Sequence, residues 1–83
     1  MLNNKKSQSL FLDLKRGATA FYLNPKGKTY LVFLNHALKI VEKKGLKRKI
    51  ERIKRRAARA KAQEVTNLAD EMLTLGILIK KAI

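Results

Sequence analysis

The spacing of apolar residues in the first third of the chain predicts β-structure. Two short runs, residues 19–23 and 29–34, are rich in the aromatic and β-branched side chains that strands favour. Pro25 and Gly27 lie between them; proline presets φ early in a turn, and glycine tolerates the positive φ of a bulged hairpin. A third apolar run, residues 10–14, precedes the pair. These runs predict an N-terminal β-hairpin or three-stranded antiparallel meander.

The second run of the hairpin also fits a helix. Residues three or four apart would share one face of a helix over residues 30–44: Tyr30, Leu34, Ala37 and Val41. We favour the hairpin because residues 29–34 directly follow the turn signal, so the predicted fold class is α+β and the alternative is all-α. One domain is expected over residues 1–83, with an aromatic-rich β part at 1–34 and a helical part at 35–83.

The second half of the chain carries a helical pattern. Asn35 is expected to cap a short helix over residues 37–44, and Gly45 suits the left-handed position just past its end. Beyond it the pattern continues without proline or glycine until Gly76, where we expect a long helix to end. A break near Thr66 would divide that helix, because threonine is a favourable N-cap.

Charge changes the picture most strongly in the basic run, which we define as residues 43–61. The whole chain has a net charge of +14, and the basic run holds eleven lysines or arginines against one acid, Glu51. At about 100° per residue its arginines fall on one side of a helix, within a sector roughly 100° wide, and its apolar residues fall opposite. The arginine face consists of Arg48, Arg52, Arg55, Arg56 and Arg59. The apolar stripe consists of Leu46, Ile50, Ile53, Ala57 and Ala60.

The arginine face indicates a polyanionic partner. Arg48, Arg52 and Arg56 follow one another at i,i+4 spacing, which destabilises an isolated helix by a few tenths of a kcal/mol per pair. A ligand with phosphates would relieve that repulsion, and guanidinium groups fit phosphate oxygens through paired donors. Residues 46–61 contain no Asn, Gln, Ser or Thr to read base edges. We therefore predict binding to the nucleic-acid backbone with low sequence specificity, with RNA favoured over DNA.

The predicted binding residues extend beyond the arginines. They are the cations of the basic run and of the turn before it: Arg48, Arg52, Arg55, Arg56, Arg59, Lys43, Lys44, Lys47, Lys49, Lys54, Lys61, Lys26 and Lys28. Tyr22 is the best candidate for an exposed aromatic that stacks on a base. Two alternatives remain, a small architectural DNA-binding protein and an interaction protein that docks its basic face on an acidic partner protein.

Catalytic and metal-binding patterns are missing from the sequence. His36 is the single histidine, Asp13 stands apart from other acids, and cysteine is absent. We expect no enzyme activity, no catalytic residue, no metal site and no cofactor. The longest apolar runs are far shorter than a membrane-spanning helix, and the start of the chain is polar, so we expect no membrane partner and a cytoplasmic location.

In size, charge and the expected order of sheet and basic helix, the chain resembles small phage-encoded RNA-binding proteins, among them the TifA-type inhibitors of ToxIN-like RNase toxins. The resemblance rests on the 83-residue length, the net charge of +14 and the basic run. It implies a phage or mobile-element factor that antagonises a host RNA-dependent toxin or nuclease. It assigns no role to individual residues.

An apolar stripe near the C-terminus predicts self-association. Its members recur at helical spacing, with a short apolar run after them: Val65, Leu68, Met72, Leu75, and then Ile77, Leu78 and Ile79. A small sheet would not cover all of this surface, so we predict a homodimer through residues 65–83. The alternative is that the stripe folds back on the N-terminal part of the same chain and completes a monomeric core.

Overall fold

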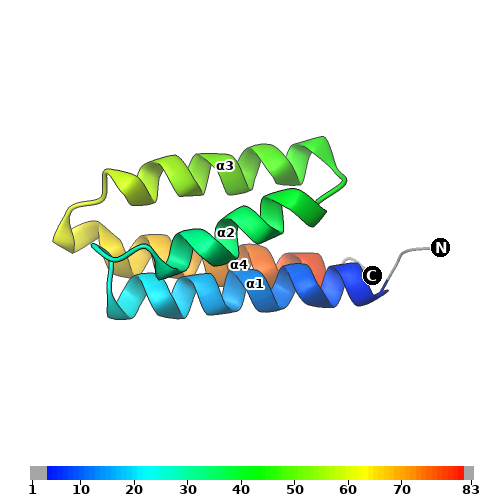
Figure 1. Ribbon diagram of the computed structural model, residues 1–83, viewed down its shortest axis with the longest axis horizontal. Coiled ribbons are helices and arrows are strands. Elements are labelled where there is room, and N and C mark those ends of the chain that lie inside the picture. Colours follow the sequence, from blue (N-terminus) through cyan, green and yellow to red (C-terminus); the bar gives the residue numbers. More distant parts are fainter. Residues whose placement is uncertain (1–3, 82–83) are drawn as a thin grey trace.

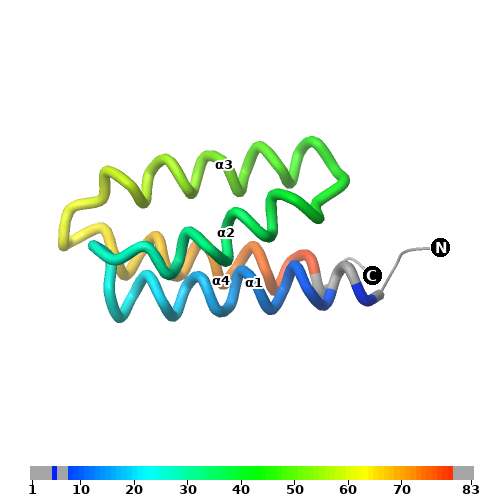
Figure 2. The backbone as a smooth tube through the Cα atoms, in the orientation of Figure 1, coloured from blue at the N-terminus to red at the C-terminus, as the bar shows by residue number. Residues whose placement is uncertain are grey.

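A computed structural model, which describes residues 4–81, shows four helices that run alternately up and down the long axis of the molecule (Figures 1 and 2). The helices are α1 (Asn4–Leu23), α2 (Thr29–Ile40), α3 (Lys44–Ala58) and α4 (Val65–Lys81), with a short 3₁₀ turn, η1 (Ala62–Glu64), before the last. The molecule measures 41 × 18 × 17 Å. Short connections between antiparallel neighbours are typical of a four-helix bundle.

The four helices do not contribute equally to the bundle. α1 packs closely against α2 on one side and α4 on the other. α3 lies opposite α1, along the upper edge in Figure 1, and contacts α2 and α4. The basic helix is therefore an outer member of the bundle, attached along a narrow strip.

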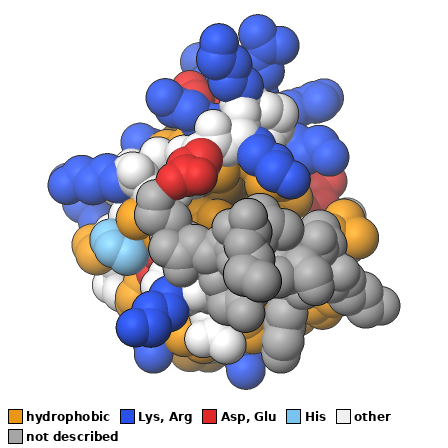
Figure 3. Space-filling model, turned by 90° about the vertical axis from the view of Figure 1, so that its right-hand side faces the viewer, with side chains coloured by type: hydrophobic (Ala, Val, Ile, Leu, Met, Phe, Trp, Pro, Cys, Tyr) orange, Lys and Arg blue, Asp and Glu red, His pale blue; other side chains and the backbone are white. Residues whose placement is uncertain are grey.

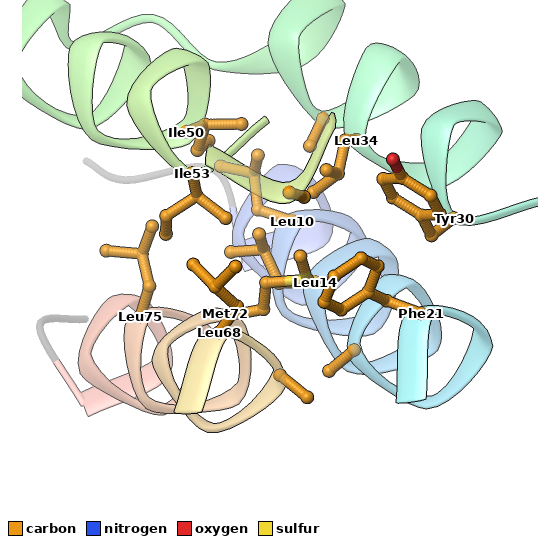
Figure 4. Close-up of a cluster of buried hydrophobic side chains, with 14 of the residues drawn as sticks. Leu10, Leu14, Phe21, Tyr30, Leu34, Ile50, Ile53, Leu68, Met72 and Leu75 are labelled. Carbon is orange, nitrogen blue, oxygen red and sulfur yellow. The ribbon is translucent and has the colours of Figure 1, made fainter. Parts of the chain in front are cut away.

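The core lies between α1 and its two neighbours, and α3 adds three buried side chains to it (Figure 4). α1 contributes a face of residues three or four apart: Leu10, Leu14, Ala18 and Phe21. Leu14 and Phe21 are fully buried, and the Phe21 ring meets Tyr30 of α2 edge to face, with centroids 4.8 Å apart. Burial raises the pKa of the Tyr30 hydroxyl above its usual value of 10.0.

α1 and α4 pack closely together at Gly76. A Cβ atom at this position would lie 3.3 Å from Leu14 Cβ and 3.4 Å from Phe11 Cδ1, which is tighter than normal packing. Glycine therefore serves here as a contact point between two helices. Our expectation that Gly76 ends the helix is wrong, because α4 continues through it to Lys81.

The predicted α+β fold is wrong, and the all-α alternative describes residues 4–81. The runs 10–14 and 19–23 lie within α1, and 29–34 forms the first half of α2. Strand propensity was overridden by packing, because the large apolar residues of both segments recur every three or four positions and bury one helical face each. The sheet-then-helix order that contributed to the resemblance to TifA-type inhibitors is consequently absent from the described residues.

The turn predicted between residues 24 and 28 is present, but it joins two helices. Gly27 N–H donates to Asn24 O at 3.1 Å, with Pro25 at the second position of the turn. None of the described glycines has a positive φ, so Gly27 does not adopt the conformation that we assigned to it. Proline and glycine thus predicted the position of the turn correctly, but they did not predict the type of secondary structure on either side of it.

The other predicted helix limits need correction as well. Asn35 lies inside α2 and does not cap it, and Gly45 lies in the first turn of α3. The long helix expected from residue 46 is interrupted at residues 59–64. The break that we expected near Thr66 falls close to the observed start of α4 at Val65.

The C-terminal apolar stripe is covered within the chain. Val65, Leu68, Met72, Leu75 and Ile79 are all buried, in the same cluster as the apolar face of α1. This is the alternative that we gave for the stripe, with α1 as the helix that covers it. The surface that motivated the homodimer is therefore occupied, whereas Ile77 and Leu78 stay exposed. Residues 82–83 of the predicted interface lie outside the described part.

Candidate nucleic-acid interface

The basic helix is held in place by three side chains. Ile50, Ile53 and Ala57 of α3 are buried, and Figure 4 shows the two isoleucines directed into the same cluster as Leu10 and Met72. Leu46 and Ala60, at the two ends of the apolar stripe, are partly buried. The apolar stripe predicted from the sequence is thus the surface by which α3 joins the bundle.

The arginine face points away from the bundle. All five arginines are exposed, four of them within α3 and Arg59 immediately after it. Arg59 N–H donates to Arg56 O at 3.1 Å, which keeps the backbone turning past the last helical residue. The space-filling view shows lysine and arginine side chains crowded at the top of the molecule, on the side where Figure 1 places α3 (Figure 3).

Four of these arginines surround one shallow hollow. It has a volume of about 450 Å³, and its lining consists of Arg52, Arg55, Arg56, Arg59 and one acid, Glu64 of η1. Several guanidinium groups around one depression can engage the oxygens of a single phosphate or of two neighbouring phosphates. This is the densest group of arginines on the described surface.

The lysines of the predicted site extend this surface in two directions. Lys43 and Lys44 are exposed where α3 begins, and Lys61 is exposed beyond its end. Lys26 and Lys28 lie in the turn between α1 and α2. Figure 1 shows this turn at the same end of the long axis as the connection between α3 and α4, which contains Lys61. The predicted cations therefore form a band along α3, and the turn lysines lie on a separate helix connection at one end of it.

The flank of α3 that faces α4 carries acids. Arg56 Nη1 donates to both carboxylate oxygens of Glu71, at 2.8 and 3.2 Å, and Asp70 lies beside them in a groove between the two helices. Glu71 thereby partly neutralises one member of the arginine face. Sequence reasoning missed this contact, because Arg56 and Glu71 are 15 positions apart on different helices.

The flank that faces α2 has a different character. A groove of about 590 Å³ runs between α2 and α3, with Leu31, Leu38 and Ala58 as its apolar lining. The cations along it are Lys47, Lys54 and Arg55, and one acid, Glu51, lies among them. Lys49 lies on the opposite flank, in the groove beside α4. Sequence reasoning missed this groove because it placed Leu31 in a strand.

The charges on α3 affect its own stability. Arg55 and Arg56 lie in the last turn, where cations interact favourably with the helix dipole, but the first turn contains no acid and begins at Lys44. The arginines at i,i+4 spacing repel one another. α3 therefore depends on its three buried side chains and on screening of its charges.

Two residues that we treated as isolated are bonded to each other. His36 Nδ1 of α2 donates to Asp13 Oδ2 of α1 at 2.5 Å, and Asp13 is buried. The pair joins two core helices, which is a structural role. Tyr22, the candidate for base stacking, is exposed near the end of α1 and lies next to the turn that holds Lys26.

Residues 4–81 contain no helix with the length and apolar character needed to cross a membrane. Within the same part of the chain no three His, Cys, Asp or Glu side chains gather as a metal site would require. Neither a protein family, nor a curated protein, nor a solved structure matches the chain.

Proposed function

We propose that this protein binds RNA through the phosphate backbone, with α3 as the contacting element and with low sequence specificity. The observation that carries the proposal is the exposed arginine face, four of whose members surround one hollow. Arginine forks hold phosphates by paired hydrogen bonds, and arginine-rich helices hold RNA by shape and backbone.

The remainder of the charge distribution supports the same ligand. A net charge of +14 on 83 residues raises the energy of the compact state unless a counter-charge is close. Most of that excess lies in the basic run, so a bound polyanion would neutralise the part of the molecule where repulsion is greatest. The exposed side chains of α3 are cations, apart from Glu51 and Ala58, which suits phosphates better than base edges.

The test is the binding of short fluorescent RNA, measured by anisotropy as the salt concentration rises. Each phosphate contact contributes a slope of about −0.7 to −0.9 in the logarithm of the binding constant against the logarithm of salt. We expect the double variant Arg52→Gln/Arg55→Gln to bind unrelated RNA sequences at least about tenfold more weakly. The slope of the logarithm of the binding constant against the logarithm of salt should become less negative by about 1 for each phosphate contact removed.

The matched control removes two charges elsewhere. Lys15 and Arg16 are exposed on α1, across the bundle from α3, so Lys15→Gln/Arg16→Gln has the same net charge as the test variant. Equal losses from both variants would show a diffuse charge effect and refute the role of α3. If duplex DNA binds more tightly than any RNA of the same length, the protein is a DNA-binding protein. If the affinity does not change with the salt concentration, binding to the backbone of either RNA or DNA is excluded.

A further inference from the structure

We propose that the groove between α2 and α3 receives an unpaired base, so that the nucleic acid bound by α3 is a single-stranded segment or carries an unpaired nucleotide. This inference rests on the proposed function and specifies its ligand. The groove's volume of about 590 Å³ lies within the range of small-ligand sites. Its apolar lining and its cationic rim match the two parts of a nucleotide.

The lining supplies what a base needs. Leu31 and Leu38 are only partly buried by the bundle, and Ala58 is exposed on the last turn of α3, so the groove offers apolar surface with little steric obstruction. Bases taken out of a helix are held by aromatic or apolar side chains against their faces. A base in this groove would cover leucine surface that water otherwise contacts.

The rim supplies what the phosphates need. Lys47, Lys54 and Arg55 line the groove, and they outnumber its acid, Glu51, by three to one. Arg55 also lines the arginine hollow, so the two features share a wall. A strand with its phosphates in the hollow would therefore have the base of a neighbouring nucleotide beside the groove.

The opposite flank explains why this side is the favoured one. The groove between α3 and α4 also has apolar lining and three cations, Lys49, Arg52 and Arg56, but Asp70 and Glu71 lie among them and Glu71 already binds Arg56. Two acids offset the three cations there, whereas one acid offsets three cations in the groove beside α2. A phosphate on that side would meet two carboxylates. Charge complementarity therefore directs the strand toward α2.

The experiment compares an intact single-stranded oligonucleotide with an abasic strand of the same length, and with a fully paired RNA duplex. All three carry phosphates, but only the first offers unpaired bases. We expect the wild type to bind the intact strand about tenfold more tightly than the abasic strand, which is the lower end of the range for a base stacked on an aromatic ring, because this groove offers leucine and alanine instead. Ala58→Leu partly fills the groove, keeps the charge and retains helix propensity, so it should reduce this advantage and leave duplex binding unchanged.

The matched control is Thr74→Leu. Thr74 is exposed and lines the acidic groove between α3 and α4, so the same kind of filling on that flank should leave the advantage intact. Photocrosslinking of a strand with one 4-thiouridine gives an independent location, and we expect the adducts on residues 31–38 and 54–58. Circular dichroism checks that both variants keep the helical content of the wild type.

The outcomes separate the two proposals. If no strand binds in a salt-dependent way, the proposed function fails. If intact and abasic strands bind equally, or the crosslinks fall outside the groove, phosphate binding stands and the base site is refuted. A competition assay tests for a protein ligand. If a peptide that contains leucine and glutamate displaces the bound strand at a lower concentration than unlabelled RNA does, the groove binds a protein instead. A wild-type dimer that Ala58→Leu dissociates would show that a second copy fills the groove.

Discussion

α3 and α4 are neighbouring helices of similar length, 15 and 17 residues, that expose very different surfaces. α4 buries a continuous face in the core, formed by Val65, Leu68, Ala69, Met72, Leu75 and Ile79. α3 buries three side chains and exposes all of its cations except Lys54, which is partly buried. The comparison shows that a small bundle can divide its tasks, since α1, α2 and α4 provide most of the core and α3 is left free to carry charge.

The two helices therefore depend on different forces. Burial of apolar area stabilises α4, at roughly 25 cal/mol per Å² removed from water, and that contribution hardly depends on salt. α3 gains less from burial and loses from repulsion among its arginines, which dissolved ions or a bound polyanion reduce. Changes to α4 should act on the fold, and changes to the outer side of α3 should act on binding.

The largest effect that we expect comes from Leu68→Asp in α4. Leu68 is fully buried, so an aspartate there would be an unpaired charge in the core and should cost about 4 kcal/mol or more, enough to unfold much of the protein. Thermal unfolding followed by circular dichroism measures the loss. The control Leu78→Asp introduces the same charge on the same helix, but Leu78 is 55% exposed and should tolerate it.

This variant also tests the homodimer. If α4 were mainly an interface between two copies, Leu68→Asp would give a folded monomer from a dimeric wild type, as judged by sedimentation. The structure predicts loss of folding instead. A folded, monomeric Leu68→Asp variant would contradict the intramolecular packing of α4 on α1.

The sequence indicated part of this division. The apolar stripe of the basic run and the stripe from Val65 to Leu75 both lie on buried faces, because a strong helical period is a direct consequence of packing. The helix α1 was missed, although Leu10, Leu14, Ala18 and Phe21 recur at helical spacing, and α2 was given only as the alternative to a strand. Aromatic and β-branched residues beside a proline and glycine turn suggested strands, and local propensity does not decide which neighbour a face will find.

The sequence predicted the cations of the candidate site but not the residues that lie beside them. The sequence placed all five arginines on one side, and in the structure that side is exposed. It gave no information about what lies on either flank, since Glu71 and Leu38 reach α3 only through the antiparallel packing of separate helices. Which residues lie beside α3 depends on how separate helices pack, so no spacing pattern in the sequence predicts them.

An intermediate effect should appear in the local stability of α3. Raising the salt concentration screens the arginine pairs at i,i+4, and several pairs of a few tenths of a kcal/mol each sum to about 1 kcal/mol. Amide hydrogen exchange in α3 should then slow by about fivefold. Exchange in α4 over residues 68–79, which has no such cluster of cations, is the internal control and should change little. Equal slowing in both helices would show a global stabilisation and remove the distinction between them.

The smallest effect concerns the ion pair between Arg56 and Glu71, which joins the outer surfaces of α3 and α4. Arg56 and Glu71 are each about half exposed, with side-chain accessibility of 46%, so Glu71→Gln should lower stability by less than about 1 kcal/mol. The same change frees Arg56 and removes a negative charge, and it should therefore strengthen RNA binding about twofold to threefold at low salt.

Asp70→Asn removes an equal charge from the same groove without breaking that pair, which separates the release of Arg56 from the change in net charge. We expect Asp70→Asn to strengthen binding less than Glu71→Gln does. If the two variants gain equally, Arg56 contributes only its charge and not its fork of donors, and if Glu71→Gln weakens binding, the ion pair holds Arg56 in the orientation that the ligand requires.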